Sequence, residues 1–355
     1  MTKKIGRVMI SIIGTALTDL EKVMVAHSHT AAVLLFSRNF QSKAQLKQLV
    51  SEIQKFSGKD DLPIFVDQEG GEVQRFIGDG FTKLCSFKEI GQKLIHAEEN
   101  NIASEVTSHT RKLTSELLEF GIISLTPVAD LDQGNSVITG KKRAFSSEPE
   151  LNSKILQAYV AALNSENHGA TLKHFPGHGQ AYENGNDDSH ICQPVDNRTL
   201  AEIEANDLIP FRDTLPNAAA VMPAHIIFSK VDEKNTVGTS DFWINKLLRE
   251  KLCFKGILVS DCLSMVGSGA ENFLAKTNRT LEFLDIAILS NIPPQEALNV
   301  LDNLDSGYLD KRRIPYFEQW TRFGKAERRQ ALAYEAEQDE VSMKRNNASS
   351  TVTSC

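Results

Sequence analysis

Residues 62–67 of the chain read Leu62-Pro63-Ile64-Phe65-Val66-Asp67, a short apolar run that ends at a carboxylate. An unbroken apolar run predicts a strand buried on both faces of a parallel sheet, whereas alternation would predict one face in water. Seven other runs rich in β-branched residues have the same character, and they occupy residues 8–13, 32–36, 122–128, 170–175, 219–226, 256–259 and 284–289. The chain therefore carries eight candidate strands of one type.

Segments with the apolar spacing of helices lie between these runs. In residues 43–56 the apolar side chains that share one face are Leu46, Leu49, Ile53 and Phe56. Comparable segments occupy residues 19–26, 103–120, 148–164, 200–214, 241–252, 271–283 and 294–304. Eight strand–helix alternations in a row predict a single α/β domain folded as a (β/α)8 TIM-type barrel. An open, doubly wound parallel sheet is the alternative that periodicity alone leaves open.

The length and composition fit one large globular domain. The chain has 355 residues, and its contents of 41% hydrophobic and 24% charged residues exclude wholesale disorder and fibrous structures. We expect residues 1–330 to form the barrel. Residues 331–355 are rich first in Glu and then in Ser, Thr and Asn, so we expect a disordered polar tail there.

Charge and cysteine usage indicate the class of partner and the compartment. The formal net charge is -7 with no basic stripe, which argues against nucleic-acid binding. No run reaches the ~18 apolar residues that a membrane span needs. A basic N-terminus precedes residues 8–13, but that apolar run is short for a secretion signal and no small-residue cleavage site follows it. The cysteines are scattered without metal-site spacing, which favours reduced thiols, so we expect a cytoplasmic protein.

Polar residues follow six of the predicted strands at the point where each strand ends. They are Asp67, Asp130, Lys173-His174, His225, Asp261 and Asn291. A single residue of this kind commonly caps a helix or ends a strand without any further role. Because the C-terminal ends of barrel strands meet on one face, where barrel enzymes hold their active sites, we expect these side chains to lie together.

The most informative stretch follows the predicted strand at residues 170–175. It reads Lys173-His174-Phe175-Pro176-Gly177-His178-Gly179, and Asp188-Ser189-His190 comes shortly after it. The glycines predict a mobile loop that carries His190 over a bound ligand. An Asp two residues before a His can hydrogen-bond one ring nitrogen and direct the other toward a substrate.

Together these residues resemble the family 3 glycoside hydrolases, specifically the bacterial β-N-acetylhexosaminidases of peptidoglycan recycling. Three further motifs are similar to those of the family: residues 66–76, which include Asp67 and Arg75, residues 143–145, which begin with Arg143, and residues 256–265, which include Asp261. The resemblance runs in order from about residue 7 to about residue 303, so it covers most of the chain.

The resemblance implies a retaining exo-β-N-acetylhexosaminidase. By it, Asp261 is the nucleophile that forms a covalent glycosyl–enzyme intermediate, His190 is the general acid and base, and Asp188 orients His190. A histidine suits this task because its ordinary pKa of about 6.5 allows proton release and uptake near neutrality. Two displacements at one carbon predict retention of configuration.

Five more residues match the sugar-binding positions of the family, and they are Asp67, Arg75, Arg143, Lys173 and His174. Carboxylates accept hydrogen bonds from sugar hydroxyls, and Arg and Lys donate to hydroxyl and carbonyl oxygens. The implied substrate is a small molecule, a terminal non-reducing β-linked N-acetylglucosamine on a muropeptide or anhydro-muropeptide fragment. No metal or organic cofactor and no nucleic-acid or membrane partner is implied, and we expect a monomer.

Two other functions remain open from the sequence. Lys173 at a strand end fits a Schiff-base lyase if an apolar pocket lowers its pKa. The second is a barrel that binds muropeptides without cleaving them, because Cys262 stands where these enzymes commonly have Asp and the loop before Asp188 is longer than usual. The Lys141-Lys142 pair just before Arg143 is another departure, and the aglycone preference is left undetermined.

Overall fold

The strands predicted from the sequence form a closed parallel barrel. The computed structural model describes residues 4–59, 61–182 and 185–330, so the tail expected at residues 331–355 lies outside the described residues. The barrel strands are β1 (Val8–Ser11), β2 (Thr30–Leu35), β3 (Ile64–Val66), β6 (Ile122–Ser124), β7 (Thr171–Phe175), β9 (Ala220–Pro223), β11 (Ile257–Cys262) and β12 (Ile286–Leu289).

Hydrogen bonding runs around the whole ring of strands. Except for β6 and β7, each barrel strand pairs in parallel with the next barrel strand in the chain, and β1 pairs with both β2 and β12. A parallel bridge between Val128 and Lys173 closes the remaining gap between β6 and β7. The predicted (β/α)8 barrel is therefore confirmed, and the open doubly wound sheet is excluded.

The strands are buried as their unbroken apolar runs predict. Every residue of β2, β3, β6, β7, β9 and β12 is buried, since one side of each strand fills the barrel and the other packs on helices. The strand β11 is buried through Ser260, and its last two residues, Asp261 and Cys262, are partly exposed. The buried apolar part of β11 thus places Asp261 and Cys262 at the C-terminal face of the barrel.

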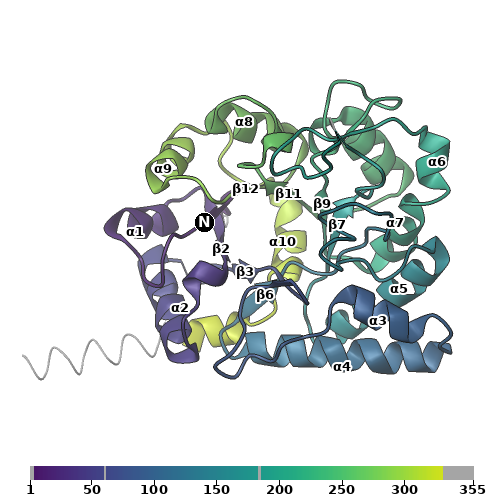
Figure 1. Ribbon diagram of the computed structural model, residues 1–355. Helices are drawn as coiled ribbons and strands as arrows, with labels where there is room; N and C mark the ends of the chain where they lie inside the picture. The colour runs from purple at the N-terminus through teal and green to yellow at the C-terminus, as the bar shows by residue number, and fades with distance from the viewer. Residues whose placement is uncertain (1–3, 60, 183–184, 331–355) are drawn as a thin grey trace, which may run out of the picture.

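A ring of helices covers the outside of the barrel (Figure 1). Its members are α1 (Asp19–Ala26), α2 (Lys43–Ser57), α4 (Glu99–Leu118), α5 (Pro149–Ser165), α6 (Leu200–Glu204), α7 (Leu208–Thr214), a π-helix (Phe242–Lys251), α8 (Phe273–Phe283) and α9 (Pro294–Asn303). Side-chain caps fix several of the helix starts, as where Thr18 and Ser42 accept hydrogen bonds from the first turns of α1 and α2. Among the described residues, no helix is both long and apolar enough to cross a membrane.

Two of the predicted helices differ in detail. Residues 200–214 form α6 and α7 rather than one helix, because the chain turns at Asp207, whose buried carboxylate accepts from Arg198 Nη1 at 2.7 Å. The helix expected at residues 241–252 is a π-helix, and it ends where the Leu252 N–H donates to the Leu247 carbonyl. Apolar periodicity indicates neither the Arg198–Asp207 ion pair nor the wider turns of a π-helix.

The N-terminal end of the barrel is closed by α10 (Ile314–Trp320), which the periodicity did not predict and which lies inside the ring in Figure 1. Trp320 is fully buried, and its Nε1–H donates to Thr171 Oγ1 at 2.9 Å, at the start of β7. The Trp320 ring centroid lies 4.6 Å from that of Phe65 in β3. Because this end is plugged, a ligand has to enter from the C-terminal end.

Short additional elements lie in the loops between the barrel strands. They are the hairpin of β4 (Gln68–Gly70) with β5 (Val73–Gln74), the parallel pair of β8 (Val195–Asp196) with β10 (Ile227–Phe228), and the helix α3 (Phe87–Leu94). The hairpin follows β3 directly, so it fixes the residues just beyond Asp67.

Candidate active site

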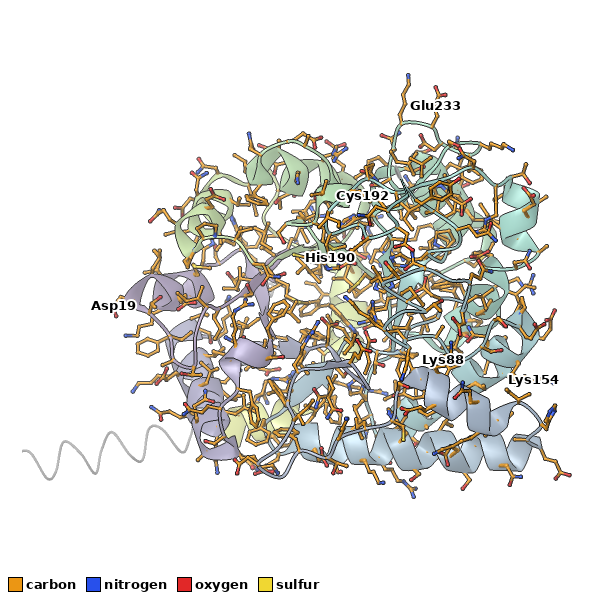
Figure 2. The ribbon with its side chains drawn as sticks, in the orientation of Figure 1. Asp19, Lys88, Lys154, His190, Cys192 and Glu233 are labelled. Atoms are coloured by element: carbon orange, nitrogen blue, oxygen red, sulfur yellow. The ribbon has the colours of Figure 1, made fainter. Side chains whose placement is uncertain are left out.

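The C-terminal ends of the barrel strands surround a cavity of about 220 Å³. The residues predicted for the site that line it are Asp67, Arg75, Arg143, Lys173, His174, His190 and Asp261. Asp188 does not line the cavity, but it hydrogen-bonds His190. Figure 2 shows His190 near the centre of the ring of helices. The structure therefore brings together side chains that stand almost 200 positions apart in the sequence.

A buried cluster of alternating charges forms the floor of the cavity. Glu69 accepts two hydrogen bonds from Arg143, from Nε and Nη2, both at 2.9 Å. Lys173 Nζ lies 2.7 Å from Glu69 Oε1 and 2.8 Å from Asp67 Oδ1. Arg75 Nη2 adds a longer contact of 3.5 Å to Asp67. Because each buried cation faces a carboxylate, the cluster holds its members in fixed positions.

The charges of this cluster shift the pKa values of its members. Burial alone would lower the pKa of Lys173, but the carboxylates of Asp67 and Glu69 outweigh burial and raise it above its ordinary value. Burial likewise opposes ionisation of Glu69, yet Arg143 and Lys173 hold the pKa of that carboxyl below its ordinary value. Lys173 is thus kept as an ammonium ion. A Schiff-base lysine needs the opposite shift, so the cluster argues against the lyase reading.

A second buried carboxylate, Asp130, orients two histidines. Its Oδ2 lies 2.8 Å from His174 Nδ1 and accepts from the His174 backbone N–H at 3.0 Å. Its Oδ1 lies 3.1 Å from His178 Nδ1 and accepts from the His178 backbone N–H at 2.6 Å. With Nδ1 of His174 held by Asp130, Nε2 is the ring atom that faces Asp261, at 3.9 Å from Oδ2.

Asp261 stands at the end of β11, with its carboxylate in the cavity. The backbone N–H of Cys262 donates to Asp261 Oδ1 at 2.7 Å and fixes the carboxylate. Burial would raise the pKa of Asp261, but the nearby His174 and His225 and the Cys262 N–H together lower it below its ordinary value. The group is therefore an ionised carboxylate at neutral pH, as a nucleophile requires.

His190 and Asp188 form a hydrogen-bonded pair at the mouth of the cavity. The distance from His190 Nδ1 to Asp188 Oδ1 is 2.6 Å, and the His190 backbone N–H donates to the same oxygen at 2.9 Å. The His190 side chain is 55% exposed, so its free Nε2 is accessible from the opening. This geometry matches the predicted Asp-x-His arrangement, in which the carboxylate holds one nitrogen and leaves the other to exchange protons.

Backbone contacts fix the His190 loop against the segment that follows Asp261. The Gly267 N–H donates to the Ser189 carbonyl at 2.9 Å, and the Val266 N–H donates to the His190 carbonyl at 3.4 Å. A Cβ at Gly267 would lie 2.9 Å from the His225 carbonyl oxygen and 3.1 Å from Ser189 Cβ, so only glycine allows this approach. The acid/base candidate and the nucleophile candidate therefore lie on segments that are hydrogen-bonded to each other.

Gly179, in the loop before His190, is required by its surroundings and not by the mobility predicted for this loop. Gly179 has φ of +53°, and a Cβ there would lie 2.7 Å from Asp196 Oδ2, which is itself bound to Arg198. The residue is needed for a close approach to this ion pair and for its left-handed backbone. Nothing in this contact requires the loop to swing.

Three side chains at the site were assigned no catalytic or binding role from the sequence. Glu69 and Asp130 anchor the cations and histidines described above, and Ser189 is a buried hydroxyl that lines the cavity. Among the described residues Ser189 Oγ makes no hydrogen bond. The only available signal for Glu69 was its place two residues after Asp67 within the family motif, and for Asp130 its place at a strand end.

Cys262, the departure from the family pattern, also lines the cavity. Its Sγ lies 2.7 Å from Ser290 Oγ and 3.0 Å from Ser264 Oγ. The backbone N–H of this residue still supports Asp261, because that contact does not depend on the side chain. The hydrogen bond that fixes the Asp261 carboxylate is therefore kept although Cys stands in place of the usual Asp.

Among the described residues, one group of three side chains could hold a metal ion, and it consists of Asp130, His174 and His178, whose ligand atoms are within 4.8 Å of one another. Both carboxylate oxygens of Asp130 already accept backbone and ring hydrogen bonds from the two histidines. A metal ion bound through the Nδ1 atoms would displace the ring hydrogen bonds to Asp130. We therefore interpret the group as a hydrogen-bonded support for His174.

The sequence is similar to one family of known proteins, both by its family profile and by individual relatives. The profile of the glycosyl hydrolase family 3 N-terminal domain matches residues 2–318. A β-hexosaminidase of Neisseria meningitidis serogroup C (strain 053442) is 40% identical over 294 residues, which cover 81% of this chain and 79% of that relative. A β-hexosaminidase of Tolumonas auensis is 35% identical over 315 residues, covering 83% of this chain and 90% of the relative.

Two solved structures are similar to this chain over almost its entire fold. The crystal structure of NagZ from Neisseria gonorrhoeae in complex with N-trifluoroacetyl-D-glucosamine has a TM-score of 0.79 and 34% identity, covering 93% of this chain and 97% of that one. A crystal structure of NagZ from the same organism in complex with zinc ion has a TM-score of 0.79 and 32% identity, covering 93% and 98%.

Proposed function

Because the chain belongs to the glycosyl hydrolase family 3 and is a β-N-acetylhexosaminidase, we propose that it removes terminal, non-reducing, β-linked N-acetylglucosamine from peptidoglycan fragments in cell-wall recycling. We propose a retaining mechanism for it, with Asp261 as nucleophile and His190 with Asp188 as acid/base pair. Support for the sugar comes from the N-trifluoroacetyl-D-glucosamine bound to the N. gonorrhoeae relative.

In the first step the Asp261 carboxylate attacks the anomeric carbon while the bond from that carbon to the leaving oxygen breaks. The proton on His190 Nε2 goes to the leaving oxygen, so the aglycone departs as a neutral alcohol. Asp188, at 2.6 Å from His190 Nδ1, stabilises the protonated ring and holds its orientation. In the second step His190 takes a proton from water, which attacks the same carbon and releases Asp261.

The other residues of the cavity bind and position the sugar in this proposal. Asp67, Arg75, Arg143, Lys173 and His174 all line the cavity, and the carboxylate contacts of the buried cluster fix the cations before substrate arrives. Fixed donors cost little reorganisation when the substrate binds, which favours the transition state. The observation that carries the mechanism is the Asp188–His190 pair held over the same cavity that Asp261 lines.

Location and assembly complete the proposal. We propose a cytoplasmic enzyme, because four cysteines of the described residues are free thiols, as a reducing compartment favours. We also propose a monomer, because one barrel already gathers Asp261, His190 and the sugar-binding candidates around a single cavity. Analytical ultracentrifugation tests the second point, and a sedimentation coefficient of a dimer would contradict it.

The direct test of function is hydrolysis of 4-nitrophenyl N-acetyl-β-D-glucosaminide and of a peptidoglycan-derived N-acetylglucosaminyl-anhydro-muropeptide. We expect the wild-type protein to cleave both and Asp261→Ala to cleave neither. With sodium azide, Asp261→Ala should form the α-glycosyl azide and His190→Ala the β-glycosyl azide, since azide replaces the nucleophile in one variant and water in the other.

Matched controls separate chemistry from folding in this test. Asp19→Ala removes an exposed carboxylate of α1, which Figure 2 shows at the outer edge of the molecule, and His96→Ala removes an exposed histidine outside the cavity. Both should keep wild-type activity. Tight binding of N-acetylglucosamine by a folded wild-type protein without turnover of either substrate would instead support the muropeptide-binding alternative.

A further inference from the structure

Lys141 differs from the other cations of the cavity because no carboxylate of the described residues lies within ion-pair distance of it. It lines the cavity and is partly buried, and with residues 4–59, 61–182 and 185–330 it forms no hydrogen bond and no ion pair. The deeper cations Arg143 and Lys173, in contrast, each contact Glu69 at less than 3 Å. An ammonium ion at the wall of a binding site that forms no hydrogen bond or ion pair with the described residues is available to a ligand.

The backbone around Lys141 is held in place by a network of turns. The Gly140 N–H donates to the Asn135 carbonyl at 3.1 Å, and the Lys142 N–H donates to the Thr139 carbonyl at 3.0 Å. The Arg143 N–H, two residues after Lys141, donates to the Ile138 carbonyl at 2.9 Å. Lys141 therefore projects from an ordered connection and not from a free loop.

The same connection is tied to the loop that carries the acid/base pair. The Ser136 N–H donates to Asp187 Oδ2 at 2.7 Å, and Asn135 Nδ2 donates to the Asp187 carbonyl at 3.3 Å. Asp187 directly precedes Asp188. Burial opposes ionisation of Asp188, but hydrogen bonds from His190, together with the charge of Lys141, lower its pKa. Lys141 consequently lies on the side of the cavity where the acid/base pair stands.

The position of the acid defines which part of the substrate is near Lys141. A general acid has to reach the leaving oxygen, so the aglycone lies on the side of His190 in the bound substrate. We propose that Lys141 is a specificity-determining residue that pairs with a carboxylate on the leaving group, so that the enzyme prefers anionic aglycones. This inference rests on the proposed function, since it needs a glycoside whose aglycone leaves past His190.

The chain offers a matched comparison at the next position. Lys142 is exposed, its φ is +57°, and its charge acts on Glu89. Lys142 does not line the cavity. Variants at residues 141 and 142 thus remove the same charge from the same turn, with only the first facing a bound aglycone.

The test uses two N-acetyl-β-glucosaminides of equal size, one with 4-hydroxyphenylacetate and one with 4-hydroxyphenylacetamide as aglycone. The observable is the ratio of kcat/KM for the acid to kcat/KM for the amide. Because a half-exposed ion pair is worth about two- to fivefold, we expect Lys141→Met to lower the ratio about threefold and Lys141→Glu about tenfold. Lys141→Arg and Lys142→Met should keep it, and 0.5 M NaCl should lower the wild-type ratio toward that of Lys141→Met.

The outcomes separate this inference from the proposed function. Cleavage of the amide with an acid-to-amide ratio that is equal in wild type, Lys141→Met and Lys141→Glu would overturn the role of Lys141 alone. Equal losses on both substrates in Lys141→Met and Lys141→Arg would indicate a structural role and would also overturn it. No cleavage of either substrate by the folded wild type would overturn the proposed function, and this inference with it.

Discussion

Replacement of Glu69 by Gln removes the charge that holds two buried cations in the floor of the cavity. In the wild-type protein the two carboxylate oxygens accept from Arg143 Nε and Nη2, and one of them also lies 2.7 Å from Lys173 Nζ. Glutamine keeps the shape but has one acceptor oxygen, so its NH2 group would face an N–H donor of Arg143. The variant therefore loses hydrogen bonds and leaves a positive charge uncompensated.

The size of the effect follows from burial. Removal of one partner of a buried ion pair costs about 3–5 kcal/mol, and we take about 3 kcal/mol because Asp67 still contacts Lys173 at 2.8 Å. Unfolding entropy is about 2.1 cal/mol/K per residue, or roughly 0.7 kcal/mol/K for about 330 folded residues. The melting temperature of Glu69→Gln should then fall by about 4 °C. We also expect kcat/KM to fall about 100-fold, since Arg143 and Lys173 lose their fixed positions.

The pH dependence of this difference has a definite sign. Burial opposes ionisation of Glu69, but Arg143 and Lys173 lower its pKa in the folded state below the ordinary value. A carboxyl group with a lowered folded-state pKa contributes stability that is fully present above its unfolded pKa, about 4.3, and is lost as pH falls through the folded pKa. The gap in melting temperature between wild type and Glu69→Gln should stay constant from pH 7 to pH 5 and shrink only below about pH 4.3.

Differential scanning calorimetry at pH 7, 6, 5 and 4 measures the gap directly. Glu72→Gln is the matched control, because this carboxylate is exposed and forms no ion pair within the described part of the chain, so its melting temperature should change by less than about 1 °C. A melting temperature for Glu69→Gln within 1 °C of wild type at pH 7, or a gap that widens as pH falls, would contradict a stabilising role for the Glu69 charge.

Three further changes test the loop contact, the acid/base pair and the thiol. Gly267→Ala places a Cβ 2.9 Å from the His225 carbonyl oxygen and 3.1 Å from Ser189 Cβ, so we expect kcat/KM to fall roughly tenfold and the melting temperature to fall as well; wild-type kinetics would contradict the contact. Asp188→Asn leaves His190 without a charged acceptor, so kcat should fall by about 100-fold for a poor aryl leaving group and much less for 2,4-dinitrophenol; equal losses would argue against acid catalysis. Iodoacetamide should inactivate the wild type through Cys262, with protection by N-acetylglucosamine, whereas Cys262→Ser should resist it; inactivation of that variant at the wild-type rate would assign the sensitivity to another thiol.

Local patterns in the chain were enough to predict the barrel. Each strand is an apolar run buried on both faces, and this requirement acts on consecutive residues, so it is visible in the sequence as at residues 62–66. The polar residues at strand ends were visible for the same reason. The Asp188–His190 contact was also predictable, because the two residues are separated by one position and the hydrogen bond is local.

The sequence did not distinguish which strand-end residues face a ligand. Asp261 and Asn291 line the cavity, whereas Asp130 is buried beneath His174 and His225 donates to the Cys262 carbonyl. All four follow strands in the same way. Their different surroundings arise from the tilt of the strands and the packing of the loops above them, which no local pattern encodes.

Pairings between distant residues were decided only by the tertiary structure. Glu69 contacts Arg143 across 74 positions, and Lys173 contacts Asp67 across 106 positions. The sequence supplied the charges of these residues, and the barrel supplied their burial and separation. Since the energy of an ion pair depends on the distance between its charges and on the surrounding dielectric, the positions and pKa values of the site residues exist only once the barrel has closed.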